Sequence, residues 1–567
     1  MDKRFLLAII LSALVLVGTN LLFPTAPRTP APPRPAPTAT QPAPAAATTP
    51  APAVAATPTI GEAPQAAATP AAAAAETLTV GQGRNTYRFV SPGAAPLSLT
   101  LGDFKSLRPQ GGPMTLAAPR APLFSYRLVL GADTVALASL PTTVDRTNPA
   151  ATTQAFEAVH QGRRIRIENV VDADSFQVHV RGTVENAPAN ARLLVELPRG
   201  LESHEADVAQ DLQSLAFSYK PPRDDPQGVK FSDLDSGQVL RAEGPMKWVA
   251  LRNKYFVTAV IAEGPTPAFS EFRMTPGPEI NRIVREASGI AVLPLAQGGR
   301  FELTLLAGPQ KARLLQAMGH DLIDVNPYGG WLHGMVQPFA TIVNNILLWL
   351  KDTTQLNYGW VLIIFGVLVR LLLWPLNQSA MRSSIKMQRL QPELQEIQKK
   401  YAKDPEKQRE HLMKVYASHG MSPFSPMLGC LPMLLPMPVL FALYFVFQNT
   451  IEFRGVQFWW LQDISLKDPF YIIPVFMGLT MLLLSWIGMR GMPPNPQAKV
   501  MGYMMPAMMT LLFLNFPSGL NLYYAVQNVA AMPQQWLLTR ERQKAGAGTG
   551  GGTTAKQRAP TVNPARR

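Results

Sequence analysis

The chain has 567 residues, of which 47% are hydrophobic, a formal charge of +14 and a single cysteine, Cys430. One cysteine excludes an internal disulfide, and no metal-ligating residue types cluster near it, so redox chemistry and cysteine zinc sites are not expected. Much of the positive charge lies beside long apolar runs and near the C-terminus. That distribution is typical of a membrane protein rather than of a nucleic-acid-binding protein.

The N-terminus combines Lys3 and Arg4 with an apolar run from Phe5 to Phe23. This pattern predicts an uncleaved transmembrane anchor over residues 1–23, because a cleaved signal peptide has a shorter apolar core and a small-residue cleavage site. Residues 24–76 are almost entirely Ala, Pro and Thr. Such a segment lacks the large apolar side chains that a folded core requires, so we expect a disordered tether.

Residues 77–325 alternate between apolar and polar positions, with turn residues between the runs. The run over 163–171, RRIRIENVV, places Ile165 and Ile167 on one face, and later runs repeat this pattern. The segment therefore predicts a large antiparallel β-sandwich domain. Because the segment follows an anchor whose basic end stays inside, we expect it on the far side of the membrane, in the periplasm.

Residues 328–352 predict an amphipathic helix that lies in the membrane surface. Gln337, Asn344 and Asn345 lie off its apolar stripe. The alternative is a helix that packs against the β domain. The predicted stripe consists of Trp331, Val336, Phe339, Ile342, Ile346 and Trp349.

Residues 356–538 contain five apolar runs, at 359–376, 428–448, 470–488, 504–516 and 518–538. With the anchor they predict six spans, five of which form a helical core. The loop after the second span and the segment after Leu538 are rich in Lys and Arg, so both termini should be cytoplasmic. The fold class is thus a multi-domain membrane protein, with an α-helical transmembrane core and a periplasmic all-β sandwich domain.

Residues 377–427 predict a cytoplasmic helical hairpin, because apolar side chains recur at spacings of 3 and 4 and Pro405 begins a second helix. A solvated loop is the alternative. Residues 539–567 predict a basic, disordered cytoplasmic tail. Most of the 23 methionines lie after residue 380, which suggests an adaptable apolar binding surface. The first hairpin helix presents Met387, Leu390, Leu394, Ile397 and Tyr401.

Arg370 is the one charged residue in spans two to six, which contain no Asp or Glu. Its long side chain can snorkel to the cytoplasmic surface, or water can reach it through a recess among the helices. The last span favours the recess, because Asn521, Tyr524 and Asn528 form a polar stripe. Interhelical hydrogen bonds are the alternative role for that stripe. A proton-coupled transporter usually keeps a carboxylate in its spans, and no catalytic motif is present.

Several motifs resemble the YidC-type insertases of bacterial inner membranes. The chain departs from that family at Pro436, where Gln is common, and at Pro533, which interrupts the last apolar run. The matching motifs are VRLLLWPL at 369–376, MQRLQP at 387–392, GCLP at 429–432 with Met437-Pro438, FPSGL at 516–520 before Tyr523-Tyr524, KWV at 247–249, KYF at 254–256 and LAGPQK at 306–311.

The resemblance implies a membrane protein insertase and chaperone, not an enzyme, with a hydrated groove that opens to the cytoplasm. Its expected partners are nascent membrane proteins, the Sec translocon, the ribosome and the lipid bilayer, without a cofactor, metal or small-molecule substrate. The alternatives are a solute channel or transporter and a tethered carbohydrate-binding domain. The expected groove residues are Gly366, Arg370, Asn521, Tyr523, Tyr524, Gln527 and Asn528, and the expected apolar client contacts are Met437, Met477 and Leu512.

Overall fold

The computed structural model describes residues 76–547. The predicted anchor, nearly all of the tether and residues 548–567 of the predicted tail lie outside this range. Within the range, the residues not described are 82–84, 120, 146–151, 173, 236, 265–267, 281–282, 327–332, 376–377, 379–389, 391–392, 395, 403, 419–436 and 491–495.

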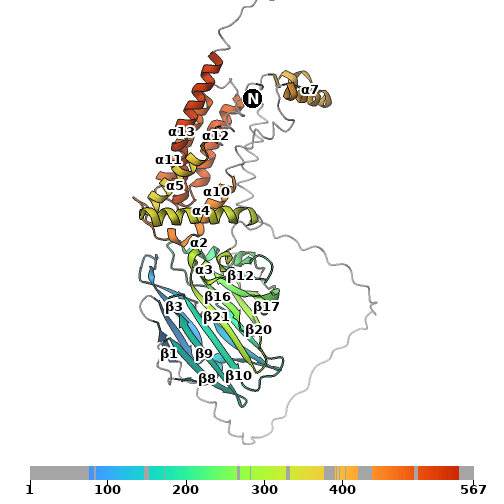
Figure 1. The fold of residues 1–567 in the computed structure, drawn as a ribbon, viewed down its shortest axis with the longest axis vertical. Helices are drawn as coiled ribbons and strands as arrows, with labels where there is room; N and C mark the ends of the chain where they lie inside the picture. The colour runs from blue at the N-terminus through green and yellow to red at the C-terminus, as the bar shows by residue number, and fades with distance from the viewer. Residues whose placement is uncertain are drawn as a thin grey trace, which may run out of the picture. The chain divides into compact units, whose positions relative to one another are not determined.

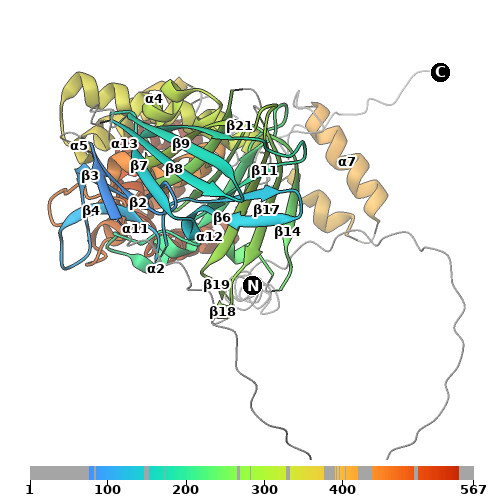
Figure 2. The same cartoon turned by 90° about the horizontal axis from the view of Figure 1, so that it is seen from below.

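The first part of the described chain is built from antiparallel sheets (Figure 1). Strands β7, β8 and β9 lie side by side in Figure 2. A nine-stranded sheet has the order β13 (Gln227–Lys230), β12 (Ala216–Lys220), β15 (Trp248–Arg252), β16 (Phe256–Glu263), β21 (Arg300–Pro309), β10 (Gln177–Val184), β9 (Arg163–Asp172), β8 (Thr153–His160), β7 (Thr142–Asp145). A six-stranded sheet has the order β14 (Leu240–Met246), β17 (Phe269–Pro276), β20 (Ala287–Pro294), β11 (Arg192–Leu197), β5 (Ser125–Leu130), β6 (Asp133–Ala136).

Smaller elements complete this domain. Short helices α2 (Val208–Gln213) and α3 (Ala312–Met318) belong to it. A four-stranded sheet joins β1 (Glu76–Val80), β2 (Asn85–Ser91), β3 (Ala95–Lys105) and β4 (Pro113–Ala117), and β18 (Glu279–Ile280) pairs with β19 (Ile283–Val284).

The alternating sequence produces the core of this domain. In β9, Ile165, Ile167, Asn169 and Val171 are buried, and the residues that alternate with them are partly exposed. Strands β15 and β16 are buried along almost their whole length, so they read as continuous apolar runs rather than as alternating ones. One hydrophobic cluster connects the sheets. The prediction of a large β-rich domain is confirmed.

The second part of the described chain is helical. Helix α11 is long and apolar enough to cross a membrane by itself, whereas α4 and α5 reach that length only as a pair, bent by 118° at their junction. The remaining predicted spans are shorter, less apolar or partly outside the described residues, so six spans stay a prediction. The helices are α4 (His333–Thr354), α5 (Tyr358–Leu372), α7 (Pro405–Ser418), α10 (Met437–Asn449), α11 (Ile472–Met489), α12 (Pro496–Phe513) and α13 (Ser518–Ala547).

Helix α4 is apolar on two faces rather than on one stripe. Val336 is buried with a set of residues that packs against the helical core, so its assignment to the exposed stripe was wrong. The buried set is Val336, Ala340, Val343, Leu347 and Leu350. The exposed set is Phe339, Ile342, Ile346 and Trp349. An exposed apolar face beside a buried one is typical of a helix that rests on a packed core and touches lipid.

Helix α13 is longer than the sequence predicts. It continues through Pro533 without a break and extends to Ala547, so residues 539–547 are helical and the disordered tail cannot begin at 539. Thr539 and Arg542 donate hydrogen bonds to the last carbonyls of α11, at Ile487 and Gly488. These bonds stabilise the extra turns, and good helix formers such as Arg and Gln favour them.

The loop between α10 and α11 attaches to the β domain through a buried ion pair. The side chains of Arg454 and Glu205 are only 4% and 6% exposed. Arg454 Nε donates to both carboxylate oxygens of Glu205, at 2.8 and 2.9 Å, and the guanidinium also donates to the carbonyls of Lys105 and His204. A charge-assisted pair of this kind fixes the orientation of both partners.

Further contacts strengthen this attachment. Tyr255 Oη donates to Ser465 Oγ at 2.9 Å, and Asp463 accepts the N–H groups of Gly455 and Ser465. Tyr255 belongs to the KYF motif, which therefore lies where the β domain meets the loop. We call Glu205, Tyr255, Arg454, Asp463 and Ser465 the Arg454 joint.

The Arg454 joint should make stability depend on pH. Burial raises the pKa of Glu205 from 4.5 to about 7, although Arg454 opposes the shift. The folded chain then holds this proton more tightly than the unfolded chain. The contribution of Glu205 to the unfolding free energy is therefore full below about pH 4.5 and is lost as pH rises through 7.

We expect protection of residues 450–471 in hydrogen exchange to weaken between pH 5 and pH 8, by about 3 kcal/mol at most, after correction for the intrinsic exchange rate. Glu205→Gln should flatten this dependence, because the variant has no proton to lose. A wild-type profile that matches the Glu205→Gln profile would contradict the assignment.

Candidate functional site

Arg370 lies in the last turn of α5 and reaches across to α13. Its Nη2 donates to Gln534 Oε1 at 2.7 Å, and Gln534 Nε2 in turn donates to the carbonyl of Trp374. The buried Nε of Arg370 has no hydrogen-bond partner among the described residues. A buried cationic N–H without a partner is costly unless water or a ligand reaches it.

A second polar contact lies one turn earlier on α5. Gln527 Nε2 donates to the carbonyl of Gly366 at 2.7 Å and to Tyr523 Oη at 3.1 Å. A Cβ on Gly366 would come within 2.9 Å of Val526 Cγ1, so glycine lets α5 and α13 approach closely. We call Gly366, Arg370, Tyr523, Gln527 and Gln534 the polar seam.

The close approach at Gly366 gives a direct test of this packing. Gly366→Ala should destabilise the helical core by about 1 to 3 kcal/mol, because the new methyl group displaces Val526. Val526→Ala removes the obstructing methyl groups, so the double variant should regain much of the lost stability. The melting temperature of the purified chain in detergent measures both effects, and equal melting temperatures for Gly366→Ala and the wild type would contradict the close contact.

The polar stripe of the last helix makes interhelical hydrogen bonds instead of joining the polar seam. Asn521 is fully buried and donates to the carbonyl of Phe513, and Asn528 donates to the carbonyl of Met477 and to Thr480. Tyr524 packs its ring against Phe513 and Tyr523. The alternative role stated for this stripe therefore fits the described contacts of both asparagines.

An apolar cavity of about 810 Å³ adjoins Arg370. Several of its lining side chains are half-exposed, Val529 at 45% and Phe476 at 51% among them, so the cavity is open rather than sealed. The cavity is lined by three groups of residues. They are Ile363, Val367, Arg370 and Leu371 of α5 with Trp374 just after it, then Trp459, Trp460, Ile472, Ile473 and Phe476, and finally Leu522, Ala525, Val526, Val529, Ala530 and Pro533 of α13.

The three predicted apolar client contacts have different environments. Leu512 is 51% exposed on α12, as a contact surface requires, whereas Met477 is buried among the core residues. Met437 begins α10, but its side chain lies outside the described set. Only Leu512 is therefore placed at the surface.

Part of the predicted hairpin is described, and its two helices contact each other. Leu390 and Leu394 form a small cluster with Val415 of α7, to which Ile397, Leu412 and Tyr416 add partly buried surface. Tyr401 stacks on His411 with the ring centroids 4.5 Å apart. Met387 lies outside the described residues.

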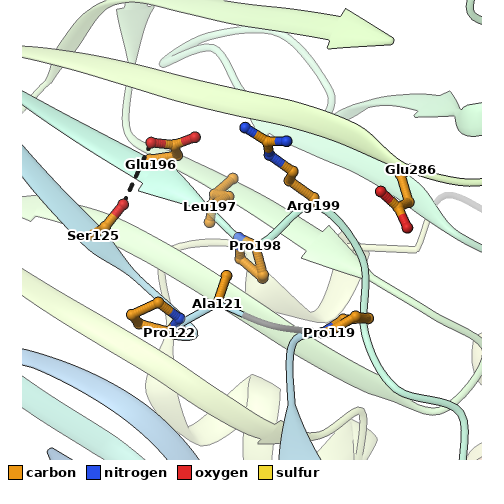
Figure 3. A pocket seen from close by; sticks show the side chains of 9 residues that line it. All are labelled: Pro119, Ala121, Pro122, Ser125, Glu196, Leu197, Pro198, Arg199 and Glu286. Carbon is orange, nitrogen blue, oxygen red and sulfur yellow. Dashed lines mark hydrogen bonds between the residues drawn. The ribbon is translucent and has the colours of Figure 1, made fainter. Parts of the chain in front are cut away.

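A cavity of about 630 Å³ with a mixed polar and apolar lining lies in the β domain (Figure 3). It contains two carboxylates, but Glu196 is already engaged by Arg127 and by Ser125. Its lining has no aromatic side chain on which a sugar ring could stack. The lining residues are Pro119, Ala121, Pro122, Ser125, Glu196, Leu197, Pro198, Arg199 and Glu286.

Sequence reasoning missed Gln534, Arg454 and Glu205. Gln534 follows Pro533 and is adjacent to Gln535. The spacing of polar residues along the helix therefore could not tell which of the two glutamines faces α5. Arg454 and Glu205 are 249 residues apart, and their pairing has no local signal. Arg454 is one of two basic residues in the segment 452–469, and that count alone does not point to a partner.

Two family models match this chain. The first, described as the 60Kd inner membrane protein, matches residues 349–545, and the second, the YidC periplasmic domain, matches residues 88–342. A protein named membrane protein insertase YidC from Anaeromyxobacter dehalogenans is 31% identical over 402 residues, which cover 68% of this chain and 70% of that protein. The chain belongs to the YidC family. As a family member it is a bacterial inner-membrane protein with a periplasmic domain, and the β domain is that domain.

Other YidC relatives match over less of their length. The membrane protein insertase YidC of Aromatoleum aromaticum is 34% identical over 57% of both chains, and that of Syntrophus aciditrophicus is 31% identical over 56% of its length. This chain therefore spans just over half the length of these relatives. A solved structure, titled as an active YidC insertase crystal structure with the first transmembrane domain resolved, is 18% identical with a TM-score of 0.33, and the match covers 82% of this chain and 95% of that one.

Proposed function

We propose that this YidC-family protein inserts newly made membrane proteins into the inner membrane and assists their folding. The observation that carries the proposal is Arg370, a half-buried cation with an unpaired N–H beside an open apolar cavity. In the proposed mechanism, the apolar stretch of a client lies along this cavity while its hydrophilic segment meets Arg370.

The physical role of this site is to lower the barrier for hydrophilic segments. A carboxylate at the centre of a bilayer costs roughly 2.5 to 3.5 kcal/mol on insertion scales, and unsatisfied backbone groups add to this. The Arg370 guanidinium offers an acidic segment a partner of opposite charge. Water that hydrates the unpaired Nε would shorten the dry part of the path.

The other segments have proposed roles in the same process. Six spans place both termini in the cytoplasm, where Lys and Arg are concentrated. The hairpin formed by 377–427 would receive the client, and the basic segment after Ala547 would contact ribosomal RNA through phosphate contacts. Cooperation with the Sec translocon belongs to the same proposal. Asn521, Tyr524 and Asn528 would hold the neighbouring helices in place.

A reconstituted insertion assay tests the proposal. Purified protein in proteoliposomes should insert a ribosome-synthesised client with one span and a short acidic translocated tail, measured by protease protection of the tail. Empty liposomes are the control. Failure to insert any such client, together with measurable flux of small solutes across the same proteoliposomes, would favour a channel or transporter.

A further inference from the structure

Two tryptophan–arginine pairs lie on neighbouring helices, one at the end of α11 and one within α13. The sequences WIGMR at 486–490 and WLLTR at 536–540 share the spacing Trp-x-x-x-Arg. In both, the guanidinium carbon lies 3.5 Å from the centroid of the tryptophan ring one turn earlier. A cation held over an indole face in this way keeps its N–H edge free for another partner.

The two pairs lie at nearly the same level along α11 and α13. Asn528 donates to the carbonyl of Met477, Thr539 to that of Ile487 and Arg542 to that of Gly488. This nearly constant offset means that α11 and α13 run parallel and in contact. Trp486 and Trp536 are 50 positions apart, close to this offset, so they lie within about one helical turn of each other in height.

The surroundings of the pairs change from apolar to cationic at this height. Both tryptophans are 43% exposed, and Leu483 and Leu537 beside them are also exposed. Neither Arg490 nor Arg540 has an acidic partner among the residues that the structure describes, and Arg542 adds a third positive charge nearby. Exposed indoles at such a boundary are typical of a membrane–water interface.

We propose that Trp486, Arg490, Trp536 and Arg540 bind the phosphate of an anionic phospholipid in the cytoplasmic leaflet. Arginine recognises phosphate oxygens through paired N–H groups, and the exposed leucines would contact the acyl chains of the same lipid. A zwitterionic lipid is a poorer ligand, because its own cation would face three arginines. A soluble phosphate or RNA would leave the apolar half of the surface uncovered. The inference rests on the proposed membrane orientation of the helices.

Native mass spectrometry of the full-length protein in detergent tests this site. The probe is phosphatidylglycerol, titrated against phosphatidylcholine with the same acyl chains. We expect the double variant Arg490→Gln/Arg540→Gln to lose at least about tenfold in affinity for phosphatidylglycerol while retaining the wild-type melting temperature. The charge-matched control Arg164→Gln/Arg181→Gln, on exposed positions of the β domain, should bind like the wild type.

The outcomes separate this inference from its alternatives. Equal affinity of the double variant and the wild type would overturn it, as would equal binding of phosphatidylcholine. Displacement of the lipid by millimolar inorganic phosphate or by an RNA oligonucleotide would assign the arginines to a soluble ligand instead. The assay contains no client, so a failure here is distinct from a failure of insertion in proteoliposomes.

Discussion

Replacing Arg370 with alanine should slow insertion of clients that translocate acidic segments by at least about tenfold. Tenfold corresponds to roughly 1.4 kcal/mol, about half of the cost of a carboxylate in the bilayer. The variant removes the cation beside the cavity and also leaves Gln534 Oε1 without its donor. Clients whose translocated segment has no charge should be affected much less. Protease protection in proteoliposomes measures both rates.

Matched variants test whether the Arg370 charge acts on clients in the cavity or merely reaches the membrane surface by snorkelling. Leu372→Ala lies on the same helix at a position that is 76% exposed and should insert all clients normally. Arg370→Lys should restore only part of the activity, because lysine cannot both donate to Gln534 and present a planar edge to a client. Full activity of Arg370→Lys would favour snorkelling, and normal activity of Arg370→Ala would refute the role of the charge.

Replacing Arg454 with alanine should weaken the attachment of the β domain to the loop between α10 and α11 by about 3 kcal/mol, since removing one partner of a buried ion pair leaves the other uncompensated. The variant loses the bonds to Glu205 and those to the carbonyls of Lys105 and His204. Burial already raises the pKa of Glu205 to about 7, so Glu205 can take up a proton when Arg454 is removed. The loss of stability should therefore lie near the lower end of the range that is usual for breaking a buried ion pair. Hydrogen exchange of residues 450–471 measures it.

A double variant identifies the source of this effect. Arg454→Met/Glu205→Leu replaces both charges with apolar side chains of similar volume, which is often much less destabilising than breaking the pair. We therefore expect the double variant to retain more protection than Arg454→Ala. If residues 450–471 exchange as fast in the double variant as in Arg454→Ala, the ion pair does not hold the loop against the β domain.

Local periodicity in the sequence predicted the strands and helices whose buried and exposed faces follow a regular spacing. The alternation at Ile165 and Ile167 predicted β9, and the exposed Phe339, Ile342 and Trp349 lie on the amphipathic helix expected there. Val336 was misplaced because a stripe read at spacings of three to five merges two neighbouring faces of one helix. The extension of α13 to Ala547 was missed because contacts with α11, rather than the composition of the segment, stabilise it.

Long-range pairings could not be predicted in the same way. The sequence singled out Arg370 by its isolation in an apolar run, but its partner depends on how α5 crosses α13. Asn521 and Asn528 lie on one face of the last helix, and that spacing suits a hydrated groove as well as interhelical hydrogen bonds. Only the hydrogen bonds in the structure distinguish the two roles. The same reason explains why Glu205 carried no signal.

Photo-crosslinking tests the central claim most directly, namely that clients lie in the cavity beside Arg370. A photoreactive amino acid at Val529, a half-exposed lining residue, should crosslink to a ribosome-bound nascent membrane protein. The same probe at Trp349 on α4, which is 59% exposed and outside the cavity, should not. The Arg370→Ala background should reduce the Val529 crosslink for an acidic client. Equal crosslinking from both positions, or none from Val529, would contradict the account.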